Sequence, residues 1–415
     1  MFEPENDLFN LAMSSKAQPL MQAVQKHVND NVDPITEEFF ALDKNKADRW
    51  TWDPRQLELL DGAKKKAKES GLWNFFLPDS EMGDGLTNLD YAYIAAELGK
   101  SPLASETLNC SAPDTGNMEV LERVGTETQK RQWLKPLLDG QIRSAYAMTE
   151  PDLASSDAKN ISTTAVLDGE DWVINGEKFY ISGAGDPRCK IMIVMVKTSP
   201  NAAPSRQQSQ ILVPNDTPGV ETLEAMEVFG HDHAPLGHMH LRFNNVRVPK
   251  DNILLGEGRG FEISQVRLGP GRIHHCMRSI GKAEKALELM VKRAGTRVAF
   301  GKPIAKLGKN LEVIARARIE INAMRLSVLQ AAKAMDVLGN KEARVYVSAV
   351  KAMVPEKVCS IIDQAIQIHG AAGISQWTPL AQMYTDLRHL RFADGPDEVH
   401  HMVVGRAEVQ KYGLW

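Results

Sequence analysis

A short stretch near the C-terminus, RFADGPDEVHH at 391–401, contains residues that could abstract a proton. The Gly-Pro pair after Asp394 cannot continue a helix, because glycine is permissive and proline lacks an N–H. We expect Pro396 to take the first position of a new helix over 398–412. Asp394 would then lie on a tight turn, where its carboxylate can project into a cavity and act as a general base. The alternative is that Asp394 or Asp397 only caps the last helix.

A second group of polar residues is the segment 231–240, which holds four histidines. No Cys or carboxylate cluster with matching spacing accompanies them, so we expect no metal site. Alternation places His238 and His240 on one strand face, which would meet solvent or another domain.

The composition is that of a globular protein. The 415 residues allow two or three domains and a large core. A net charge of −4 argues against nucleic acid or an anionic membrane as a partner. The four cysteines are scattered without CxxC spacing, which indicates reduced thiols. No apolar run could span a bilayer and no targeting signal is recognised, so we expect a cytoplasmic protein.

Residues 1–140 are expected to form a helical domain. Apolar residues recur at helical spacing over 17–40, and Pro34 should end or kink that helix. Thr126 and Gln129 form the pattern of a capping box, which predicts the start of another helix.

Strand and turn signals dominate residues 141–255. Asp-Gly at 168–169 and Asn-Gly at 175–176 are both hairpin signals. Residues 238–248 alternate between apolar and polar, which is typical of a half-buried strand. We expect a small antiparallel barrel or sandwich.

Residues 256–415 are again helical in pattern. Apolar residues recur at i, i+3 and i+4 over 263–294, 311–338 and 342–369, and these long helices with short links predict a bundle. The predicted fold class is α+β, mainly α, with an N-terminal helical domain, a middle antiparallel β-barrel or sandwich and a C-terminal four-helix bundle.

This order of domains, together with several local stretches, resembles the acyl-CoA dehydrogenase family over nearly the whole chain. SAYAMTEPDLASSD at 144–157 is similar to the family's flavin-binding strand and loop, although the loop is one residue longer. NGEKFYIS at 175–182 is similar to the strand whose aromatic residue stacks on the flavin and whose hydroxyl bonds its N5 region. The family commonly has Trp and Thr at these two positions. The resemblance implies FAD, bound by Tyr146, Met148, Thr149, Ser155, Ser156, Tyr180 and Ser182.

Two stretches of the last domain, RVAFGK at 297–302 and QIHGAAG at 367–373, resemble segments that contact the FAD of a neighbouring subunit. An arginine there suits a pyrophosphate. The resemblance therefore implies a homodimer or homotetramer whose cofactor site spans two chains. The residues concerned are Arg297, Phe300, Gln367 and Gly370.

The resemblance also assigns the base. One branch of the family places its catalytic Glu at the position that Gly271 occupies here. Because glycine has no carboxylate, this chain cannot use that arrangement. The family's other location is the turn before the last helix, where Asp394 falls on the Glu position. The substrate-binding residues implied are Arg272, Ser156, His275 and Arg278.

The implied activity is the FAD-dependent α,β-dehydrogenation of an acyl-CoA in fatty acid β-oxidation, with electrons passed to an electron-transferring flavoprotein. Asp394 would remove the α-proton and FAD N5 would accept the hydride. The branch most resembled is that of the dehydrogenase domains fused to a kinase-like domain in animals. A 4-hydroxy or 4-phospho group on the substrate would need donors such as His274, His275 and Arg278.

Two alternatives stay open. A flavin oxidase resembling nitroalkane oxidase also uses an Asp base. A nucleic-acid-binding flavoprotein shares the fold, although the net charge of −4 and the lack of a basic tail disfavour it. Acyl chain length, electron acceptor and the choice between dimer and tetramer are not fixed by the sequence.

Overall fold

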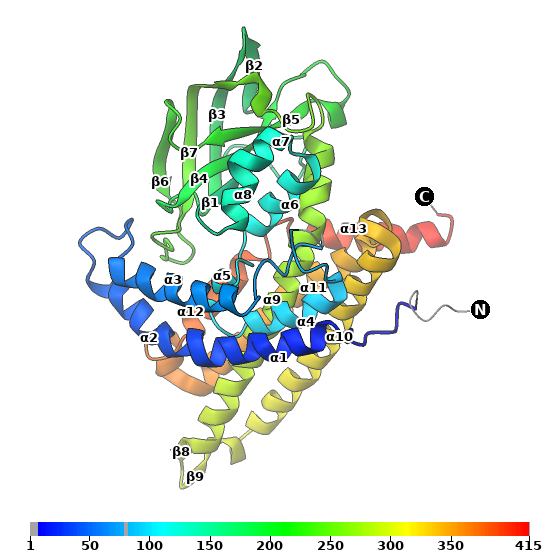
Figure 1. Ribbon diagram of the computed structural model, residues 1–415. Helices are drawn as coiled ribbons and strands as arrows, with labels where there is room; N and C mark the ends of the chain where they lie inside the picture. Colours follow the sequence, from blue (N-terminus) through cyan, green and yellow to red (C-terminus); the bar gives the residue numbers. More distant parts are fainter. Residues whose placement is uncertain (1–6, 79–81, 415) are drawn as a thin grey trace. The chain divides into compact units, whose positions relative to one another are not determined.

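The computed structural model describes residues 7–78 and 82–414. The predicted fold class is confirmed, because helices precede and follow a β-rich middle section along the chain (Figure 1). In the described part of the chain, no helix is both long and apolar enough to cross a membrane. The chain divides into two compact units. The helical unit comprises the residues up to Thr36, Lys66–Leu108 and the residues from Gly271 onwards, and the sheet unit comprises Glu37–Lys65 and Asn109–Pro270. The domain boundaries expected after residues 140 and 255 stay predictions.

The first long helix changes its winding just before Pro34. Helix α1 (Ala17–His27) leads through a π-helical turn, Val28–Val32, into α2 (Asp33–Ala41). Proline has no N–H to donate and its ring crowds the preceding turn. The wider π-helical turn accommodates the proline, so the helix does not end there.

The helical unit is centred on long helices that pack side by side. Helix α11 contacts α10, α12 and α13, and α10 contacts α4. A short hairpin, Val298–Ala299 with Lys302–Pro303, connects α9 to α10. The helices are α4 (Asn88–Leu98), α5 (Ala104–Thr107), α9 (Gly260–Thr296), α10 (Asn310–Glu342), α11 (Arg344–His369), α12 (Leu380–His389) and α13 (Asp397–Lys411), and α3 (Pro54–Glu69) and α9 continue into the sheet unit.

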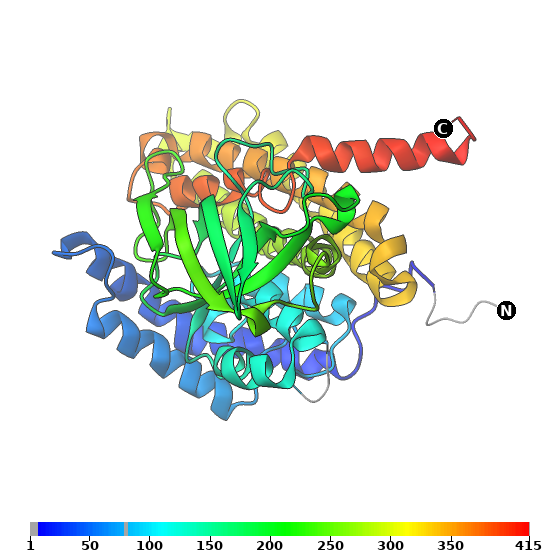
Figure 2. The same ribbon diagram turned by 90° about the horizontal axis from the view of Figure 1, so that it is seen from above.

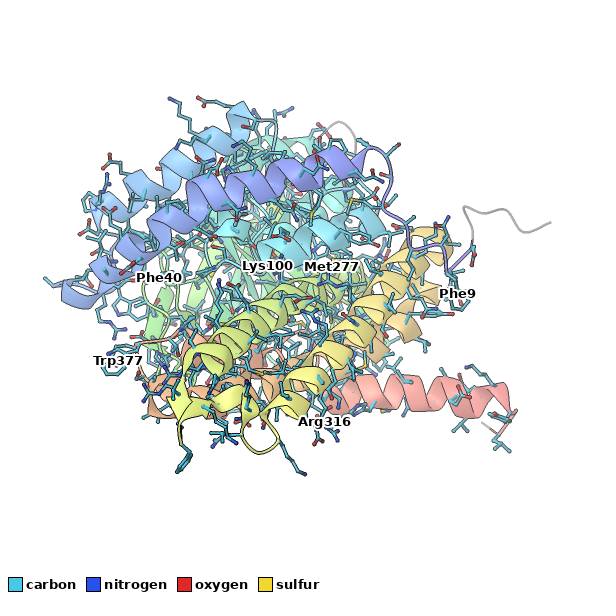
Figure 3. The ribbon with its side chains drawn as sticks, turned by 90° about the horizontal axis from the view of Figure 1, so that it is seen from below. Phe9, Phe40, Lys100, Met277, Arg316 and Trp377 are labelled. Atoms are coloured by element: carbon cyan, nitrogen blue, oxygen red, sulfur yellow. The ribbon has the colours of Figure 1, made fainter. Side chains whose placement is uncertain are left out.

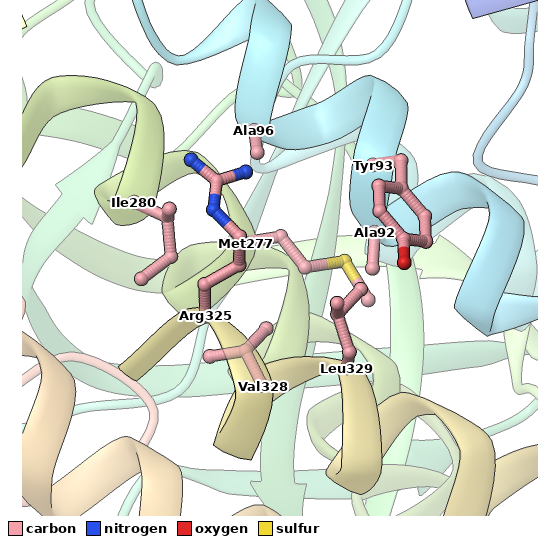
Figure 4. Close-up of a pocket in the computed structure, with 8 residues that line it drawn as sticks. All are labelled: Ala92, Tyr93, Ala96, Met277, Ile280, Arg325, Val328 and Leu329. Atoms are coloured by element: carbon pink, nitrogen blue, oxygen red, sulfur yellow. The ribbon is translucent and has the colours of Figure 1, made fainter. Parts of the chain in front are cut away.

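Two glycines let α4 and α9 approach closely. A Cβ on Gly99 would lie 2.0 Å from the carbonyl oxygen of Arg278, and one on Gly281 would lie 1.9 Å from that of Ala96. No side chain fits such distances, so the backbones of the two helices are in direct contact. Figure 4 shows side chains of α4, α9 and α10 meeting around a small pocket beside this contact. The residues that line it are Ala92, Tyr93, Ala96, Met277, Ile280, Arg325, Val328 and Leu329.

The sheet unit contains one curled seven-stranded sheet (Figure 2). Its strands follow the order β1-β4-β2-β3-β7-β6, and β5 pairs with β4. The expected antiparallel pairing holds for β2–β3, β3–β7, β6–β7 and β4–β5, whereas β1 runs parallel to β4. The strands are β1 (Arg143–Ala147), β2 (Thr164–Asp168), β3 (Asp171–Ser182), β4 (Cys189–Lys197), β5 (Gln208–Pro214), β6 (Val220–Ala225) and β7 (His238–Pro249).

The two hairpin signals have different outcomes. Asp168 pairs with Asp171 across a two-residue loop, so the predicted turn at 168–169 is confirmed. The predicted turn at 175–176 is wrong, because these residues lie inside β3. A Cβ on Gly176 would come within 2.8 Å of the Cα of Thr163, so glycine is needed there for close backbone approach rather than for a turn.

Short helices connect the first part of the sheet unit to β1. The predicted capping box is confirmed at α7, where the Thr126 hydroxyl accepts from the Gln129 N–H at 3.2 Å and the Gln129 side chain accepts from the Thr126 N–H at 2.9 Å. The connecting helices are α6 (Asp114–Val124), α7 (Glu127–Gln129), a π-helical turn (Lys130–Leu134) and α8 (Lys135–Leu138).

Candidate functional site

Asp394 lies on a tight turn between α12 and α13. Its φ of 56° is in the left-handed region, and Gly395 follows with a φ of 111°. Pro396 has an extended ψ of 159°, so it precedes the helix and does not take the predicted first position; α13 begins at Asp397, one residue before the predicted range of 398–412. The N-cap residue of α13 is Pro396, and among the described residues no side-chain hydrogen bond is found at this cap, so neither Asp394 nor Asp397 takes the N-cap position that was the alternative.

A buried lysine and a partly buried arginine hold this turn by its backbone. Nζ of Lys351 donates to the carbonyl of Leu390 at 2.6 Å and to that of Gly395 at 3.2 Å. Nε of Arg272 donates to the carbonyl of Asp394 at 2.8 Å. Burial lowers the pKa of both cations, although the nearby Asp394 carboxylate favours their charged forms. The position of the Asp394 backbone is therefore fixed from two helices, α9 and α11.

The carboxylate of Asp394 lies against α9 and is 15% exposed. A Cβ on Gly271 would be only 2.9 Å from its Oδ2, so glycine leaves the space that the carboxylate occupies. Nε2 of His275 is 3.4 Å from the same oxygen. Nη2 of Arg278 is in turn 3.3 Å from Nδ1 of His275. Two residues that were predicted to bind substrate, His275 and Arg278, thus form a row that ends at the predicted base.

The imidazoles around this turn are neutral at neutral pH. His274 is 1% exposed and packs edge-on against Tyr91, with ring centroids 4.8 Å apart. Neither of its nitrogens has a hydrogen-bond partner among the described residues. Burial and nearby cations hold the pKa of His274 well below its usual value and lower that of His400 to about 3. Burial also lowers the pKa of His275, although Asp394 opposes this effect.

In the sheet unit, the ends of β1 and β3 lie side by side. The N–H of Phe179 donates to the carbonyl of Thr149 at 3.0 Å. The Thr149 hydroxyl donates to the carbonyl of Phe179 at 2.5 Å, so its proton is used inside the protein and its oxygen is left to accept. Tyr146 and Met148 precede it on the same segment, and the Tyr146 hydroxyl is 3.1 Å from that of Ser264.

The loop after β1 is shaped by Ser155. Its hydroxyl accepts from the N–H of Glu150 at 2.9 Å and donates to the carbonyl of Leu153 at 3.3 Å. Ser156 follows with an exposed side chain. The Ser155 N–H donates to the carbonyl of Leu153 at 2.8 Å, so this amide is used inside the loop.

Tyr180 presents a flat ring at the end of β3. The residue has a φ of 54° and is 40% exposed, and the strand register shifts between Lys178 and Ile181. The Tyr180 hydroxyl donates to the carbonyl of Glu227 at 2.8 Å, which fixes the ring. Two residues on, the Ser182 hydroxyl is 2.8 Å from Nδ1 of His238. A fixed and half-exposed aromatic ring beside a hydroxyl can stack on a planar polar ligand.

A buried ion pair joins the two strand ends. Nζ of Lys178 donates to Glu150 at 2.8 Å and to the carbonyl of Met148 at 2.9 Å. Glu150 also accepts from Ser162 and Thr163. Burial opposes ionisation of Glu150, but Lys178 and these donors lower its pKa to about 2. Burial lowers the pKa of Lys178 to about 8, although Glu150 opposes this effect.

The histidines at 231–240 form side-chain contacts within the sheet unit. His240 is 2.8 Å from Glu177 through Nε2. The rings of His233 and His238 meet edge to face with centroids 5.0 Å apart. Over residues 7–78 and 82–414, no group of three or more His, Cys, Asp or Glu is placed to hold a metal ion.

The residues expected to reach a neighbouring subunit lie on the surface of the helical unit. Phe300, at the tip of the β8–β9 hairpin, is 94% exposed, and Arg297, Gln367 and Gly370 are exposed as well. Trp377, seven residues after Gly370, is 82% exposed (Figure 3).

Sequence reasoning did not identify Lys351. A signal was present, because Lys351 stands four residues after Val347 and three before Val354, which is an apolar helix face where a cation has to find acceptors inside the protein. The Glu150–Lys178 pair was missed as well, although each residue lies inside a stretch that the resemblance had singled out.

Comparison with known proteins covers nearly the whole chain. Three family models match in order: acyl-CoA dehydrogenase N-terminal domain at residues 16–141, middle domain at 145–246 and C-terminal domain at 258–409. The probable acyl-CoA dehydrogenase FadE2 of Mycobacterium tuberculosis is 55% identical over 354 residues, which are 85% of this chain and 86% of that protein.

Acyl-CoA dehydrogenase family member 10 of Mus musculus is 50% identical over 403 residues, or 96% of this chain, but the match spans only 37% of that longer protein. A solved structure from Mycobacterium abscessus, also named for an acyl-CoA dehydrogenase, superposes with a TM-score of 0.93 at 48% identity and covers 97% of this chain and 100% of that one.

Proposed function

The chain belongs to the acyl-CoA dehydrogenase family of oxidoreductases, and from this premise we propose that it oxidises an acyl-CoA thioester to the 2-enoyl-CoA. In this reaction a proton leaves Cα, a hydride leaves Cβ and a double bond forms between the two carbons. The observation that carries the proposal is the enclosed carboxylate of Asp394, on a turn held by the side chains of Arg272 and Lys351.

Asp394 is assigned as the base. A carboxylate oxygen takes the α-proton and becomes a neutral acid, while the electron pair of the broken C–H bond stays on Cα until the hydride leaves Cβ. General-base help of this kind is typically worth roughly 10² to 10⁴ in rate. We assign the backbone N–H of Asp394 as a donor to the thioester carbonyl, which stabilises the negative charge that develops there.

FAD is the inferred cofactor, and the sheet unit offers residues that fit it. The fixed ring of Tyr180 can stack on an isoalloxazine, and the hydroxyls of Ser182 and Thr149 offer polar partners at its edge. The small side chains of Ser155 and Ser156 would let a pyrophosphate approach the backbone of this loop closely. FAD, when bound, accepts the hydride from Cβ, which no side chain can do.

A second copy of the chain is proposed to complete each cofactor site. Arg297, Phe300, Gln367 and Gly370 are exposed, and an exposed phenylalanine beside an arginine suits a subunit contact that carries a phosphate. We expect a homodimer or homotetramer in which Arg297→Met lowers the FAD content of the purified protein. Full FAD occupancy in that variant would contradict the shared site. Electrons are proposed to pass to an electron-transferring flavoprotein.

The substrate is proposed to carry a 4-hydroxy or 4-phospho group. Nη1 of Arg278 is buried and, within the described part of the chain, has no hydrogen-bond partner, as is true of both nitrogens of His274. A buried donor without a partner is costly, and a phosphate or hydroxyl would satisfy it. Arg272 and Ser156 are further proposed substrate contacts. Equal kcat/KM for plain and 4-phosphorylated acyl-CoA would contradict this part of the proposal.

The decisive experiment compares wild type with Asp394→Asn, each with FAD bound. Anaerobic titration with a panel of acyl-CoAs should bleach the flavin of the wild type and not that of the variant. Retained turnover in the variant would refute the assignment of the base. Oxygen consumption with a nitroalkane, in place of bleaching by acyl-CoA, would favour an oxidase, and a salt-dependent shift of DNA would favour a nucleic-acid-binding flavoprotein.

A further inference from the structure

The buried ion pair of Lys178 and Glu150 lies between three stretches that are proposed to hold FAD. We propose that this pair positions the FAD site, because it fixes the strand end 148–149, the loop 151–161 and the outward-facing ring of Tyr180 in one arrangement. This inference rests on the proposed function, in which FAD is the inferred cofactor. Neither member of the pair is proposed to touch FAD, so both are positioning residues.

The Glu150 carboxylate accepts four hydrogen bonds. One oxygen accepts from Nζ of Lys178 at 2.8 Å and from the N–H of Thr163 at 2.9 Å. The other oxygen accepts from the N–H of Ser162 at 2.8 Å and from the hydroxyl of the same residue at 2.6 Å. Glutamine has a single oxygen and would turn its own N–H groups towards donors, so a carboxylate is the group that satisfies this arrangement.

These bonds close the base of the loop that follows β1. Glu150 begins the loop, and its carboxylate reaches Thr163 at the end of the loop. Thr163 is in turn held by β3 and β4, because its hydroxyl donates to the carbonyl of Glu177 at 3.3 Å and its carbonyl accepts from the N–H of Lys197 at 2.7 Å. The Ser155 hydroxyl accepts from the N–H of Glu150, so the part of the loop that is proposed to meet the pyrophosphate is tied to the same residue.

Lys178 connects this closed loop to β3 and to the end of β1. Its Nζ also donates to the carbonyl of Met148 at 2.9 Å. At the next residue of each segment, Phe179 and Thr149 exchange two hydrogen bonds. The register of β3 shifts directly after Lys178, and Tyr180 lies within that shift with its ring half exposed. The lysine therefore fixes the point at which the chain turns the proposed stacking ring outwards.

Stability alone does not account for an ion pair at this position. Lys178 and Glu150 are 0% and 2% exposed, and burial lowers the pKa of Lys178 to about 8, which shows that the surroundings disfavour its charge. Apolar side chains of similar volume often stabilise a core as well as a buried ion pair does. The pair differs from them because its hydrogen bonds have direction, so that they select a single arrangement of the loop and the two strand ends.

The test measures how firmly FAD is held, without any acyl-CoA. The FAD-bound protein is diluted, and the fluorescence of the released FAD gives the rate of dissociation. Lys178→Met and Glu150→Gln should each release FAD roughly 10- to 100-fold faster, because displacement of one or two hydrogen bonds to a charged ligand has an effect of that size. The fluorescence of the FAD that is still bound should also rise, because a displaced Tyr180 no longer stacks on the flavin and quenches it.

Ile174→Ala is the control for a loss of stability. Ile174 also lies on β3 and is fully buried, but it belongs to the apolar core of the sheet unit. Its truncation should lower the midpoint of thermal unfolding. FAD release should nevertheless stay within twofold of wild type, and the fluorescence of bound FAD should not change. Equal acceleration of release in Ile174→Ala and the ion-pair variants would overturn the positioning role, because any weakening of β3 would then suffice.

Ser162→Ala decides the question if the ion-pair variants do not fold. It removes one of the four donors to Glu150, and Ser162 is not among the residues proposed to contact FAD. We expect FAD release to be roughly two- to fivefold faster. Thr164→Ala is the matched control, because its hydroxyl donates to the carbonyl of Asn175 at 3.4 Å, and it should release FAD at the wild-type rate. Release at the wild-type rate in Ser162→Ala would then overturn the proposal.

The outcomes separate this inference from the proposed dehydrogenation. If the wild type holds FAD and acyl-CoA does not bleach it, the dehydrogenation fails, and the release rates still decide the positioning role. If acyl-CoA bleaches the wild type and folded Lys178→Met releases FAD within twofold of the wild-type rate, the positioning role alone is overturned. A purified wild type that does not bind FAD would overturn both.

Discussion

Replacing Gly271 by alanine should raise the stability of the protein and lower its turnover at the same time. Gly271 lies inside α9, so alanine gains roughly 0.5–1 kcal/mol of helix propensity. The added Cβ would lie 2.9 Å from Oδ2 of Asp394, whereas ordinary contact begins at 3.4 Å. The carboxylate would therefore have to move by about 0.5 Å, and since 1 Å can cost about 10²-fold, we expect a roughly tenfold fall in kcat.

The assay pairs steady-state kinetics with thermal unfolding of the FAD-bound protein. Gly405→Ala is the matched control, because Gly405 also lies inside a helix, α13, and a Cβ there meets nothing within 4 Å. Both variants should gain about 1–2 °C in unfolding midpoint, and only Gly271→Ala should lose turnover. An unchanged kcat in Gly271→Ala would refute the reasoning, because it would mean that the carboxylate is not confined there or is not the base.

Three further predictions concern stability. Lys351→Met should lower the free energy of unfolding, measured in urea, by about 1–3 kcal/mol, because the carbonyls of Leu390 and Gly395 lose their donor, and a gain in stability would contradict the role of Lys351 in holding the turn. Because the pKa of Glu150 is about 2 in the folded protein and near 4.5 in the unfolded one, its ionisation contributes stability above pH 4.5 that is lost as pH falls towards 2. Glu150→Gln should abolish this loss of stability, which is about 3 kcal/mol, when unfolding curves are recorded from pH 4.5 down to pH 2. The control variant Glu408→Gln, at an exposed position, should still show the loss. Thr126→Ala should lower the free energy of unfolding by about 1 kcal/mol through loss of the helix cap, and no change would argue against the capping box.

Helices and turns that are specified by residues close together in the sequence were predictable. The long helices repeat apolar residues every three or four positions, and the turn at Asp394 is marked by the glycine and proline that follow it. The Asn-Gly pair at 175–176 led to a wrong prediction because the reason for its glycine is not local. Glycine there makes room for a neighbouring strand, and only the paired sheet shows that neighbour.

The parts of the site that joined distant residues were not predictable. Lys351 reaches a carbonyl 39 residues away, and Lys178 reaches a carboxylate 28 residues away. Neither pairing has a spacing that a helix or a strand would repeat. The hydroxyl of Thr149 was recognised, but the direction of its hydrogen bond depends on the carbonyl of Phe179, which only the folded β3 brings near.

The left-handed backbone at Asp394 links the length of the acid to the shape of the loop. Asparagine and aspartate are the side chains that tolerate this conformation best, so the amide variant should keep the turn intact. Glutamate tolerates it less well, at a cost on the order of 1 kcal/mol. An evolutionary exchange of one acid for the other at this position would therefore carry a cost in the backbone as well as a change in reach, and a change in the loop that relaxes this backbone would favour glutamate.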